Sequence, residues 1–319
     1  MCTALSITDE DFYFGRNLDL DYNFGEQVVF TPRNAECRFK NGKVVDKHRA
    51  FIGMATVFNG VPLYADAMNE SGLAAAGLNF PGNAYFGEEK EGSLNIAAYE
   101  LITWIMCNYD SVKEVKNDFK NLNMPNIPFA EGVNPGELHY IVSDSTSSIV
   151  IEPVKEGVKI YDNPLGVLTN NPPFPEQIAN YKKNEGLSPC NPEKNMIGEG
   201  FGALGLPGDM TPASRFRKIA FLKENYIKGE NEEERVIQFF HILDGVKFIK
   251  GSVITESGKL DKTIYSCCIN GRTGDYYYKT YENPTITKVS VRSDDLNGTK
   301  IKVHPLNRFP AFMEGNFEY

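Results

Sequence analysis

The stretch MCTALSIT, residues 1–8, decides how the rest of this sequence is interpreted. Initiator methionine is usually removed when the second residue is small, so we expect the mature chain to begin with Cys2. A free α-amine has a pKa of roughly 8, and it can accept a thiol proton directly or through water. Cys2 would then be a nucleophile that carries its own base. The plain alternative is that Cys2 is an ordinary small second residue.

The motif FGRNLDLD follows and contains Arg16 and Asp19. An arginine in an apolar strand is costly unless it meets an anion, and beside a thiol it favours the thiolate. Side chains three positions apart on a straight strand point to opposite faces. The two residues can therefore share a site only if the strand bends or ends near Leu18, and Asp19 would then accept hydrogen bonds from Cys2. In the competing interpretation, Arg16 pairs with a turn carboxylate, Asp19 or Asp21.

Three further motifs offer polar side chains: VLTNNP with Asn170, GLPGDMTPASRF with Arg215, and GLNFPGN with Asn79. An asparagine amide can donate to a developing oxyanion, although asparagine is also a common turn residue. Arg215 falls in the first turn of a predicted helix, where the helix terminus already favours anions; a surface arginine is the alternative. Asn79 could present its backbone N–H and its amide.

Composition limits the classes of protein and of partner. The chain has 319 residues, 41% hydrophobic and 24% charged, with a net charge of −9. These shares are typical of globular proteins, and the negative charge disfavours nucleic acid or an anionic membrane as a partner. No apolar run approaches the roughly 20 residues of a membrane span, and no secretory signal precedes residue 17, so we expect a cytoplasmic protein.

The cysteines and histidines show no metal-binding spacing. None of the cysteines forms a CxxC pair, and the four histidines are scattered. We therefore expect free thiols, no metal and no cofactor. The six cysteines are Cys2, Cys37, Cys107, Cys190, Cys267 and Cys268.

The hydrophobic pattern predicts an α+β protein. Short strands separated by Gly, Pro, Asn or Asp are expected at residues 3–8, 13–17, 27–31, 51–58, 64–68, 73–78, 139–144, 148–152 and 158–161. Helices are expected over 95–121, with a break near 108–111 and a capping box of Ser111 and Glu114, over 211–226 behind Thr211 and Pro212, and over 231–243. Residues 170–208 are rich in turn residues, and 252–303 is β again. No linker divides residues 1–319, so one unit in which terminal strands share sheets is expected.

Several motifs in order resemble the choloylglycine hydrolases, a family that contains bile salt hydrolases and penicillin V acylases. They are MCTA, FGRNLDLD, AGLNFPGN, GVLTNNP, GLPGDMTPASRF and QFFHIL. The resemblance implies the N-terminal-nucleophile hydrolase fold, a four-layer αββα sandwich, and hydrolysis of a linear amide through an acyl-enzyme without metal or cofactor. It also implies roles for the candidate residues: Cys2 as nucleophile and base, Arg16 and Asp19 as its partners, Asn170 and Asn79 as the oxyanion hole, and Arg215 as a charge stabiliser.

Asn79 favours bile salts as substrates, because some penicillin V acylases of this family carry tyrosine there. A conjugated bile salt needs a broad apolar trough, and candidate walls are Leu18, Phe24, Phe58, Tyr64, Ile127 and Phe129; each could equally belong to the core. Family members often carry an arm that helps to build a tetramer. The corresponding residues 174–204 look short, so a homo-oligomer is expected with a dimer as the alternative.

Other functions stay open at this point. A penicillin V acylase or another N-acyl amide hydrolase could use the same scaffold. A non-catalytic binder of amphipathic anions would keep the fold without the chemistry. An amidotransferase-like enzyme with an N-terminal cysteine would need a glutamine pocket and a synthase domain, and no second domain is evident.

Overall fold

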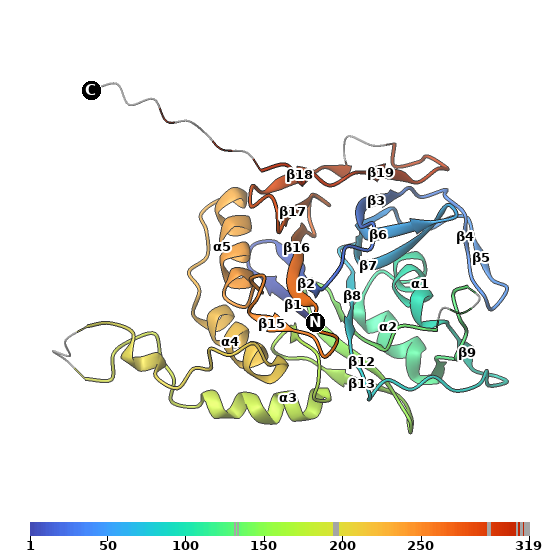
Figure 1. Cartoon of the computed structure of the whole chain (residues 1–319). Coiled ribbons are helices and arrows are strands. Elements are labelled where there is room, and N and C mark those ends of the chain that lie inside the picture. Colours follow the sequence, from blue (N-terminus) through green and yellow to red (C-terminus); the bar gives the residue numbers. More distant parts are fainter. Residues whose placement is uncertain are drawn as a thin grey trace.

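Two large antiparallel sheets dominate the structure, a computed structural model that describes residues 1–130, 132, 134–193, 198–291, 295–310, 312 and 315. Among these residues the first sheet has seven strands in the order β14-β1-β2-β16-β17-β18, with β15 paired to β16 (Figure 1). Its strands are β1 (Cys2–Thr8), β2 (Phe12–Leu20), β14 (Val167–Leu168), β15 (Val253–Ile254), β16 (Leu260–Asn270), β17 (Tyr276–Thr280) and β18 (Thr287–Val289).

The second sheet has eight described strands in the order β13-β12-β11-β8-β7-β6-β3-β19. They are β3 (Gln27–Thr31), β6 (Phe51–Phe58), β7 (Val61–Asn69), β8 (Ala74–Asn79), β11 (Leu138–Ser143), β12 (Ser148–Val154), β13 (Gly157–Asp162) and β19 (Lys302–His304). Two short pairs lie outside both sheets: β4 (Cys37–Arg38) with β5 (Val44–Val45), and β9 (Leu94–Asn95) with β10 (Leu122–Asn123).

Helices cover the outer face of each sheet. The helices are α1 (Leu101–Asn108), α2 (Val112–Asp118), α3 (Phe174–Tyr181), α4 (Pro212–Asn225) and α5 (Glu232–Asp244), with 3₁₀ turns at η1 (Ala98–Glu100), η2 (Phe119–Asn121), η3 (Lys182–Asn184) and η4 (Phe201–Ala203). Figure 1 shows α4 and α5 against the first sheet, and α1 and α2 against the second. The order of layers is therefore helix, sheet, sheet, helix, and the predicted four-layer αββα architecture is confirmed.

Two hydrophobic cores follow from this layering. The first lies around β1, β2 and β16 and reaches α4 and α5; Cys2 and Phe14 belong to it. The second lies between the eight-stranded sheet and α1, and Trp104 and Tyr140 belong to it. Strands of the second sheet contribute side chains to both cores because successive side chains alternate between faces. The nucleophile candidate thus lies in a different core from α1.

Most predicted elements occur where the sequence places them. Strands β3 and β6 have the predicted bounds, and terminal strands do share sheets, since β16 pairs with β2 and β19 pairs with β3. The predicted helix break occurs after Asn108, and Ser111 caps α2 by accepting a hydrogen bond from the backbone N–H of Glu114 at 3.3 Å. Thr211 precedes α4 as predicted, but its hydroxyl donates to Asp209 instead of capping the helix.

The turn-rich segment 170–208 contains a helix that the sequence reading missed. Helix α3 begins behind Pro173 and has Pro175 in its first turn. Prolines at helix starts are favourable because the first N–H groups have no partner within the helix. In Figure 1 the chain after α3 projects from the body before it returns to α4. Residues 194–197 of the proposed arm lie outside the described residues, and its role in assembly stays a prediction. None of the described helices is both long and apolar enough to span a membrane.

Candidate active site

Cys2 is the first residue of β1, which lies between β14 and β2 in the first sheet. It pairs with Leu18 of β2, and Ala4 pairs with Arg16. Paired residues share a face of the sheet, and so do residues two apart on a strand. Cys2 and Arg16 are therefore diagonal neighbours on one face. The thiol is buried, with 5% of the residue exposed.

Met1 covers Cys2. The backbone N–H of Asp19 donates to the Met1 carbonyl oxygen at 2.7 Å, and the N-terminal ammonium donates to the Asp19 carbonyl. The ammonium also lies 3.5 Å from a carboxylate oxygen of Asp261. Met1 itself is half-buried.

Arg16 bridges the two sheets. Its Nη1 donates to the carbonyl oxygens of Ala65 (2.9 Å) and Gly77 (2.6 Å), which belong to β7 and β8. Its Nε and Nη2 have no hydrogen-bond partner among the described residues. Burial lowers the pKa of Arg16, but neighbouring charges, that of Cys2 first among them, raise it by more. A fixed guanidinium beside the sulfur is the arrangement that favours a thiolate.

Asp19 shares this site, although β2 does not end at Leu18. The irregularity lies in the partner strand: Leu18 pairs with Tyr265 and Asp19 pairs with Thr263, so β16 has a bulge between them. The Thr263 hydroxyl donates to the Asp19 carboxylate at 2.5 Å. Burial raises the pKa of Asp19, and the charge of the N-terminus is the largest opposing influence. Asp19 is therefore a buried carboxyl next to the start of the chain, held by the Thr263 hydroxyl.

Asn170 connects the start of β1 to the end of β14. Its Oδ1 accepts hydrogen bonds from the Cys2 backbone nitrogen and from Arg215 Nη2, both at 2.8 Å. Its Nδ2 donates to the carbonyl oxygen of Asn79 at 2.7 Å. Because two donors face one end of the amide and an acceptor faces the other, its orientation is fixed. One Nδ2 proton beyond the bond to Asn79 is left to donate.

Arg215 enters from the first turn of α4. Its Nη1 donates to the Cys2 carbonyl at 2.6 Å and to the Thr3 hydroxyl at 2.5 Å. Burial lowers the pKa of Arg215, and the nearby charges of Asp19, Cys2 and Asp261 oppose this. The residue is not the surface arginine of the alternative interpretation, since only 1% of it is exposed. Of the six predicted catalytic residues, Cys2, Asn79, Asn170 and Arg215 are joined by hydrogen bonds. Arg16 and Asp19 are linked to them through their charges.

Supporting residues that the sequence reading missed hold Asn170 in place. Gln177 of α3 donates to the Asn170 carbonyl at 2.5 Å. His139 Nε2 lies 2.9 Å from the carbonyl oxygen of Thr169, while its Nδ1 lies 3.1 Å from Glu152. No local motif marks these residues, because their partners are distant in sequence.

The residues predicted to line the apolar trough do not lie together in the structure. Leu18 adjoins Cys2, and Phe24 packs against the first core. The rings of Phe58 and Phe129 meet edge to face with centroids 5.3 Å apart. Ile127, close to Phe129 in sequence, is half-buried. Tyr64 lies in the second core, where its hydroxyl is 2.7 Å from that of Thr31.

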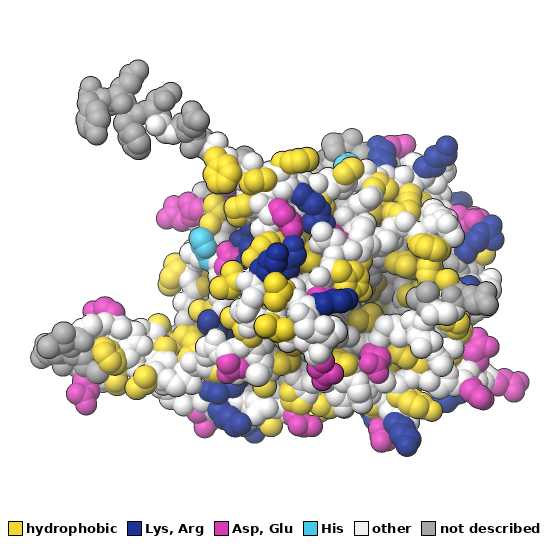
Figure 2. Space-filling model, in the orientation of Figure 1, with side chains coloured by type: hydrophobic (Ala, Val, Ile, Leu, Met, Phe, Trp, Pro, Cys, Tyr) yellow, Lys and Arg dark blue, Asp and Glu magenta, His cyan; other side chains and the backbone are white. Residues whose placement is uncertain are grey.

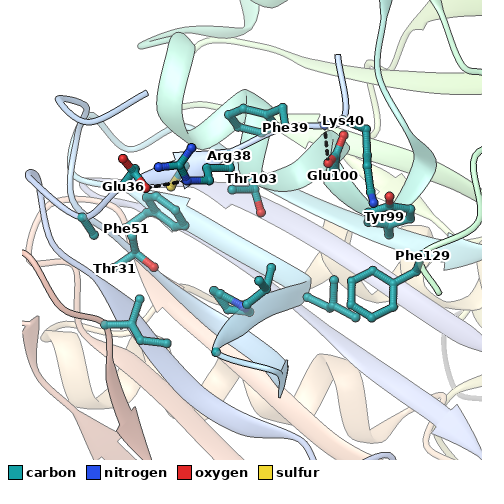
Figure 3. Close-up of a pocket in the computed structure, with 17 residues that line it drawn as sticks. Thr31, Glu36, Arg38, Phe39, Lys40, Phe51, Tyr99, Glu100, Thr103 and Phe129 are labelled. Atoms are coloured by element: carbon teal, nitrogen blue, oxygen red, sulfur yellow. Dashed lines mark hydrogen bonds and ion pairs between the residues drawn. The ribbon is translucent and has the colours of Figure 1, made fainter. Parts of the chain in front are cut away.

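A cavity of about 390 Å³ is lined by Phe129 among other residues, and Cys2 is not part of its lining. Figure 3 shows Tyr99 and Phe129 at one end and Glu36 and Arg38 at the other. The described residues that line it include none of the six predicted catalytic residues. In Figure 2 basic side chains stand among hydrophobic ones on the face around the N-terminus, despite the acidic net charge.

Residues 2–304 match the family model described as linear amide C–N hydrolases, choloylglycine hydrolase family. The chain belongs to the choloylglycine hydrolase family. Among its relatives are bile salt hydrolase/transferases from Lactiplantibacillus plantarum, 43% identical over 96% of this chain and 97% of that protein, and from Clostridium perfringens, 41% identical over 97% and 98%. As a choloylglycine hydrolase family member, the protein is a linear amide C–N hydrolase.

Solved structures of the family agree with the fold. A variant of the conjugated bile acid hydrolase from Clostridium perfringens superposes with a TM-score of 0.91 at 39% identity, covering 99% of this chain and 100% of that one. The penicillin V acylase from Agrobacterium tumefaciens gives a TM-score of 0.76 at 19% identity over 95% and 90%. The second likeness concerns the fold alone.

Proposed function

We propose that this protein hydrolyses the amide bond of glycine- or taurine-conjugated bile salts through an acyl-enzyme on Cys2, with residues 1–319 as one catalytic domain. The observation that carries the proposal is the hydrogen bond from the Cys2 backbone nitrogen to Asn170. Removal of Met1 would convert this nitrogen into the α-amine, at a position where an acceptor already holds it. Nucleophile and base then come from one residue.

In the first half of the reaction, the Cys2 sulfur attacks the carbonyl carbon of the substrate amide. The carbonyl oxygen gains negative charge, and preorganised N–H donors lower the energy of that state. The free Nδ2 proton of Asn170 is the donor supported by the hydrogen-bond pattern. The C–N bond then breaks, the α-ammonium gives its proton to the leaving glycine or taurine, and a thioester remains on the sulfur.

In the second half, the α-amine takes a proton from water, and the resulting hydroxide attacks the thioester. The C–S bond breaks, the free bile acid leaves, and the sulfur returns to its thiolate form. Arg16 would stabilise that thiolate through its unpaired N–H groups. Arg215 would fix the backbone of Cys2, and the buried Asp19 carboxyl would act on the amine.

The relatives support bile salts as the substrate class, since their names state bile salt or conjugated bile acid hydrolysis. The family resemblance supports the same choice, because this chain has Asn79 where some penicillin V acylases carry tyrosine. We place the steroid against Leu18, which belongs to the same core as Cys2, and Phe24, which packs against that core. Phe58 and Phe129 would bound the outer part of the trough, and the placement of Tyr64 in the other core makes it a poor wall.

The test compares initial rates on glycocholate, taurocholate and penicillin V for the wild-type protein and for Cys2→Ala. The proposal expects the conjugated bile salts to be the best substrates and the variant to be inactive on all three. Turnover of penicillin V or an acyl-homoserine lactone alone would refute the substrate class. Full activity of Cys2→Ala would refute the nucleophile, and binding of bile salts without turnover by the wild-type protein would favour the non-catalytic binder.

A further inference from the structure

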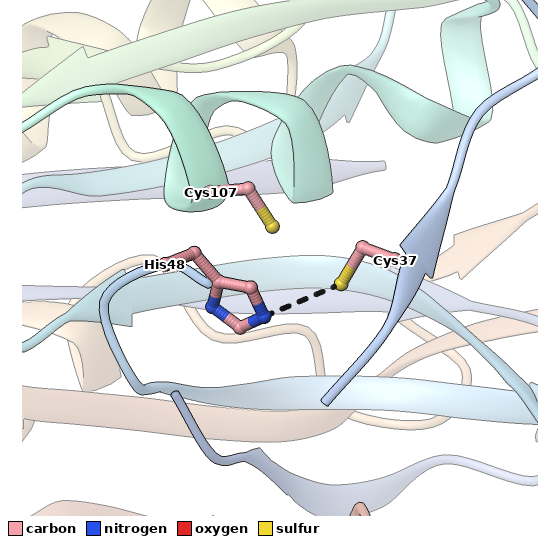
Figure 4. Close-up of side chains that lie close together, drawn as sticks. All are labelled: Cys37, His48 and Cys107. Carbon is pink, nitrogen blue, oxygen red and sulfur yellow. Dashed lines mark hydrogen bonds between the residues drawn. The ribbon is translucent and has the colours of Figure 1, made fainter. Parts of the chain in front are cut away.

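Two cysteines and a histidine meet on the outer side of the second sheet. Cys37 lies in β4, His48 follows β5, and Cys107 lies in the last turn of α1 (Figure 4). One donor atom from each lies within 4.8 Å of the other two. Cys107 belongs to the second core and Cys37 packs against it, whereas Cys2 belongs to the first. The trio is therefore separate from the catalytic site.

The spacing of the donors matches the coordination shell of a small metal ion. Zinc binds sulfur at about 2.3 Å and imidazole nitrogen at about 2.0–2.1 Å in a tetrahedral arrangement, which puts neighbouring donors about 3.6–3.8 Å apart. Cys37 Sγ and His48 Nε2 are 3.7 Å apart. The three donor atoms lie within 4.8 Å of one another. The Cys107 sulfur would therefore have to move by at most about 1 Å to reach the donor spacing of a zinc site.

The imidazole of His48 is already oriented for coordination. Its Nδ1 lies 2.6 Å from the carbonyl oxygen of Arg49, which can only accept, so Nδ1 carries a proton. A hydrogen bond of this kind from the far ring nitrogen is what orients most metal-binding histidines. Nε2 faces Cys37 and lies 2.8 Å from the carbonyl oxygen of Ala35. Coordination would replace that last hydrogen bond and release the Nε2 proton.

The chemistry of the three donors selects the ion. Two thiolates and an imidazole form a soft set that suits zinc better than calcium, magnesium or manganese. A cavity of about 340 Å³, lined by His48 and Cys107 among others, leaves room for water on the remaining side.

We propose that Cys37, His48 and Cys107 bind one zinc ion, with water as the fourth ligand. The ion would add a second tie between the β4–β5 pair and α1, beside the contact of the Phe39 and Trp104 rings, whose centroids are 4.8 Å apart. Residues 37 and 48 are 11 positions apart and Cys107 is far beyond both, so no zinc motif is visible in the sequence. This proposal departs from the expectation, drawn from the sequence, of a protein without metal.

The test titrates tag-free, reduced, chelator-treated protein with Zn²⁺ and Co²⁺. We expect about one ion per chain and, with Co²⁺, thiolate-to-cobalt charge-transfer absorption in the near ultraviolet. Cys37→Ser, His48→Gln and Cys107→Ser should each weaken binding by about a hundredfold or more, since each removes a direct ligand. Cys190→Ser, which alters an exposed cysteine, and Cys2→Ala are the matched controls and should bind as the wild type does.

The proposal would be overturned if the reduced wild-type protein bound much less than one ion, or if Cys37→Ser bound zinc as well as the wild type does. Cys37 is only partly buried, so this variant should fold even if Cys107→Ser does not. Recovery of a Cys37–Cys107 disulfide from protein kept with equimolar Zn²⁺ in air would likewise count against it, because a bound ion protects both thiolates. None of these measurements depends on bile salt hydrolysis.

Discussion

The Asn170 side-chain oxygen accepts a hydrogen bond from the backbone nitrogen of Cys2 at 2.8 Å, across 168 positions of sequence. The same oxygen accepts from Arg215, which also donates to the Cys2 carbonyl. Both ends of the Cys2 peptide are therefore fixed before Met1 leaves. An enzyme that uses one residue as nucleophile and base needs this rigidity, because small misplacements of reacting groups cost large factors in rate.

Loss of the thiol should abolish hydrolysis. Cys2→Ala keeps the backbone nitrogen and its bond to Asn170 but removes the sulfur that would form the thioester. We expect kcat on glycocholate to fall by about a thousandfold or more, measured by release of free glycine. Cys190→Ser, at an exposed cysteine, should keep wild-type activity. Equal loss in both variants would point to misfolding.

Removal of Met1 should be required for activity. Met1 covers Cys2 and its ammonium lies beside Asp19 and Asp261. Intact mass spectrometry of active protein should show a chain shorter by one methionine. A variant with an uncleavable residue before Cys2 should be inactive, yet as stable as the mature protein. Hydrolysis at a normal rate by protein that retains Met1 would contradict the mechanism.

Replacing Asn170 should impair catalysis more than substrate binding. Asn170→Ala removes the acceptor for the Cys2 nitrogen and the amide donor near the sulfur. A lost oxyanion donor costs about a hundred- to thousandfold in kcat, and we expect that range with little change in KM. Asn180→Ala, a half-exposed residue of α3, is the matched control. A change in KM alone would mean that Asn170 serves binding.

Replacing Arg16 should slow the reaction. Burial lowers the pKa of Arg16 and adjacent charges raise it by more, so the guanidinium is a permanent cation in the site. Without that cation, negative charge on the Cys2 sulfur loses a stabilising neighbour. Arg16→Met should therefore lower kcat/KM on glycocholate, measured by release of free glycine. An unchanged kcat/KM would contradict this role of Arg16.

Asp66 should make the protein less stable as the pH rises. Its carboxylate accepts hydrogen bonds from Tyr265 (2.5 Å) and Tyr276 (2.8 Å), but burial outweighs these bonds and the charge of Arg16, and raises its pKa above 3.8. The folded state then binds the proton more tightly than the unfolded state does. This contribution to stability is complete below pH 3.8 and is lost as the pH rises through the folded pKa.

Urea unfolding at several pH values tests this expectation. The free energy of unfolding of the wild type relative to Asp66→Asn should fall above about pH 4 by up to about 1.4 kcal/mol per pH unit. Taking the difference cancels the contributions of other carboxylates to the free energy of unfolding. Asp110 is one of them: Arg49 lowers its pKa, so its contribution changes with pH in the opposite direction.

The sequence predicted what depends on neighbouring residues. The capping box at Ser111, the bounds of β3 and β6, and the family motifs around Cys2 all rest on patterns a few residues long. Helix α3 was not predicted, because its proline and asparagine residues are also common in turns. Only packing decides between a helix and a turn for such a segment. Gln177, which holds Asn170, was missed with it.

By itself, then, the sequence determined the fold class, the family and a set of candidate residues that includes a cysteine at position 2. Tertiary structure alone decided how these residues meet: the bulge opposite Asp19, the two donors on Asn170, and the trio of Cys37, His48 and Cys107. The physical reason is that short-range patterns fix backbone geometry over one or two turns. Contacts between distant residues depend on strand register and layer packing, which arise only when the whole chain folds.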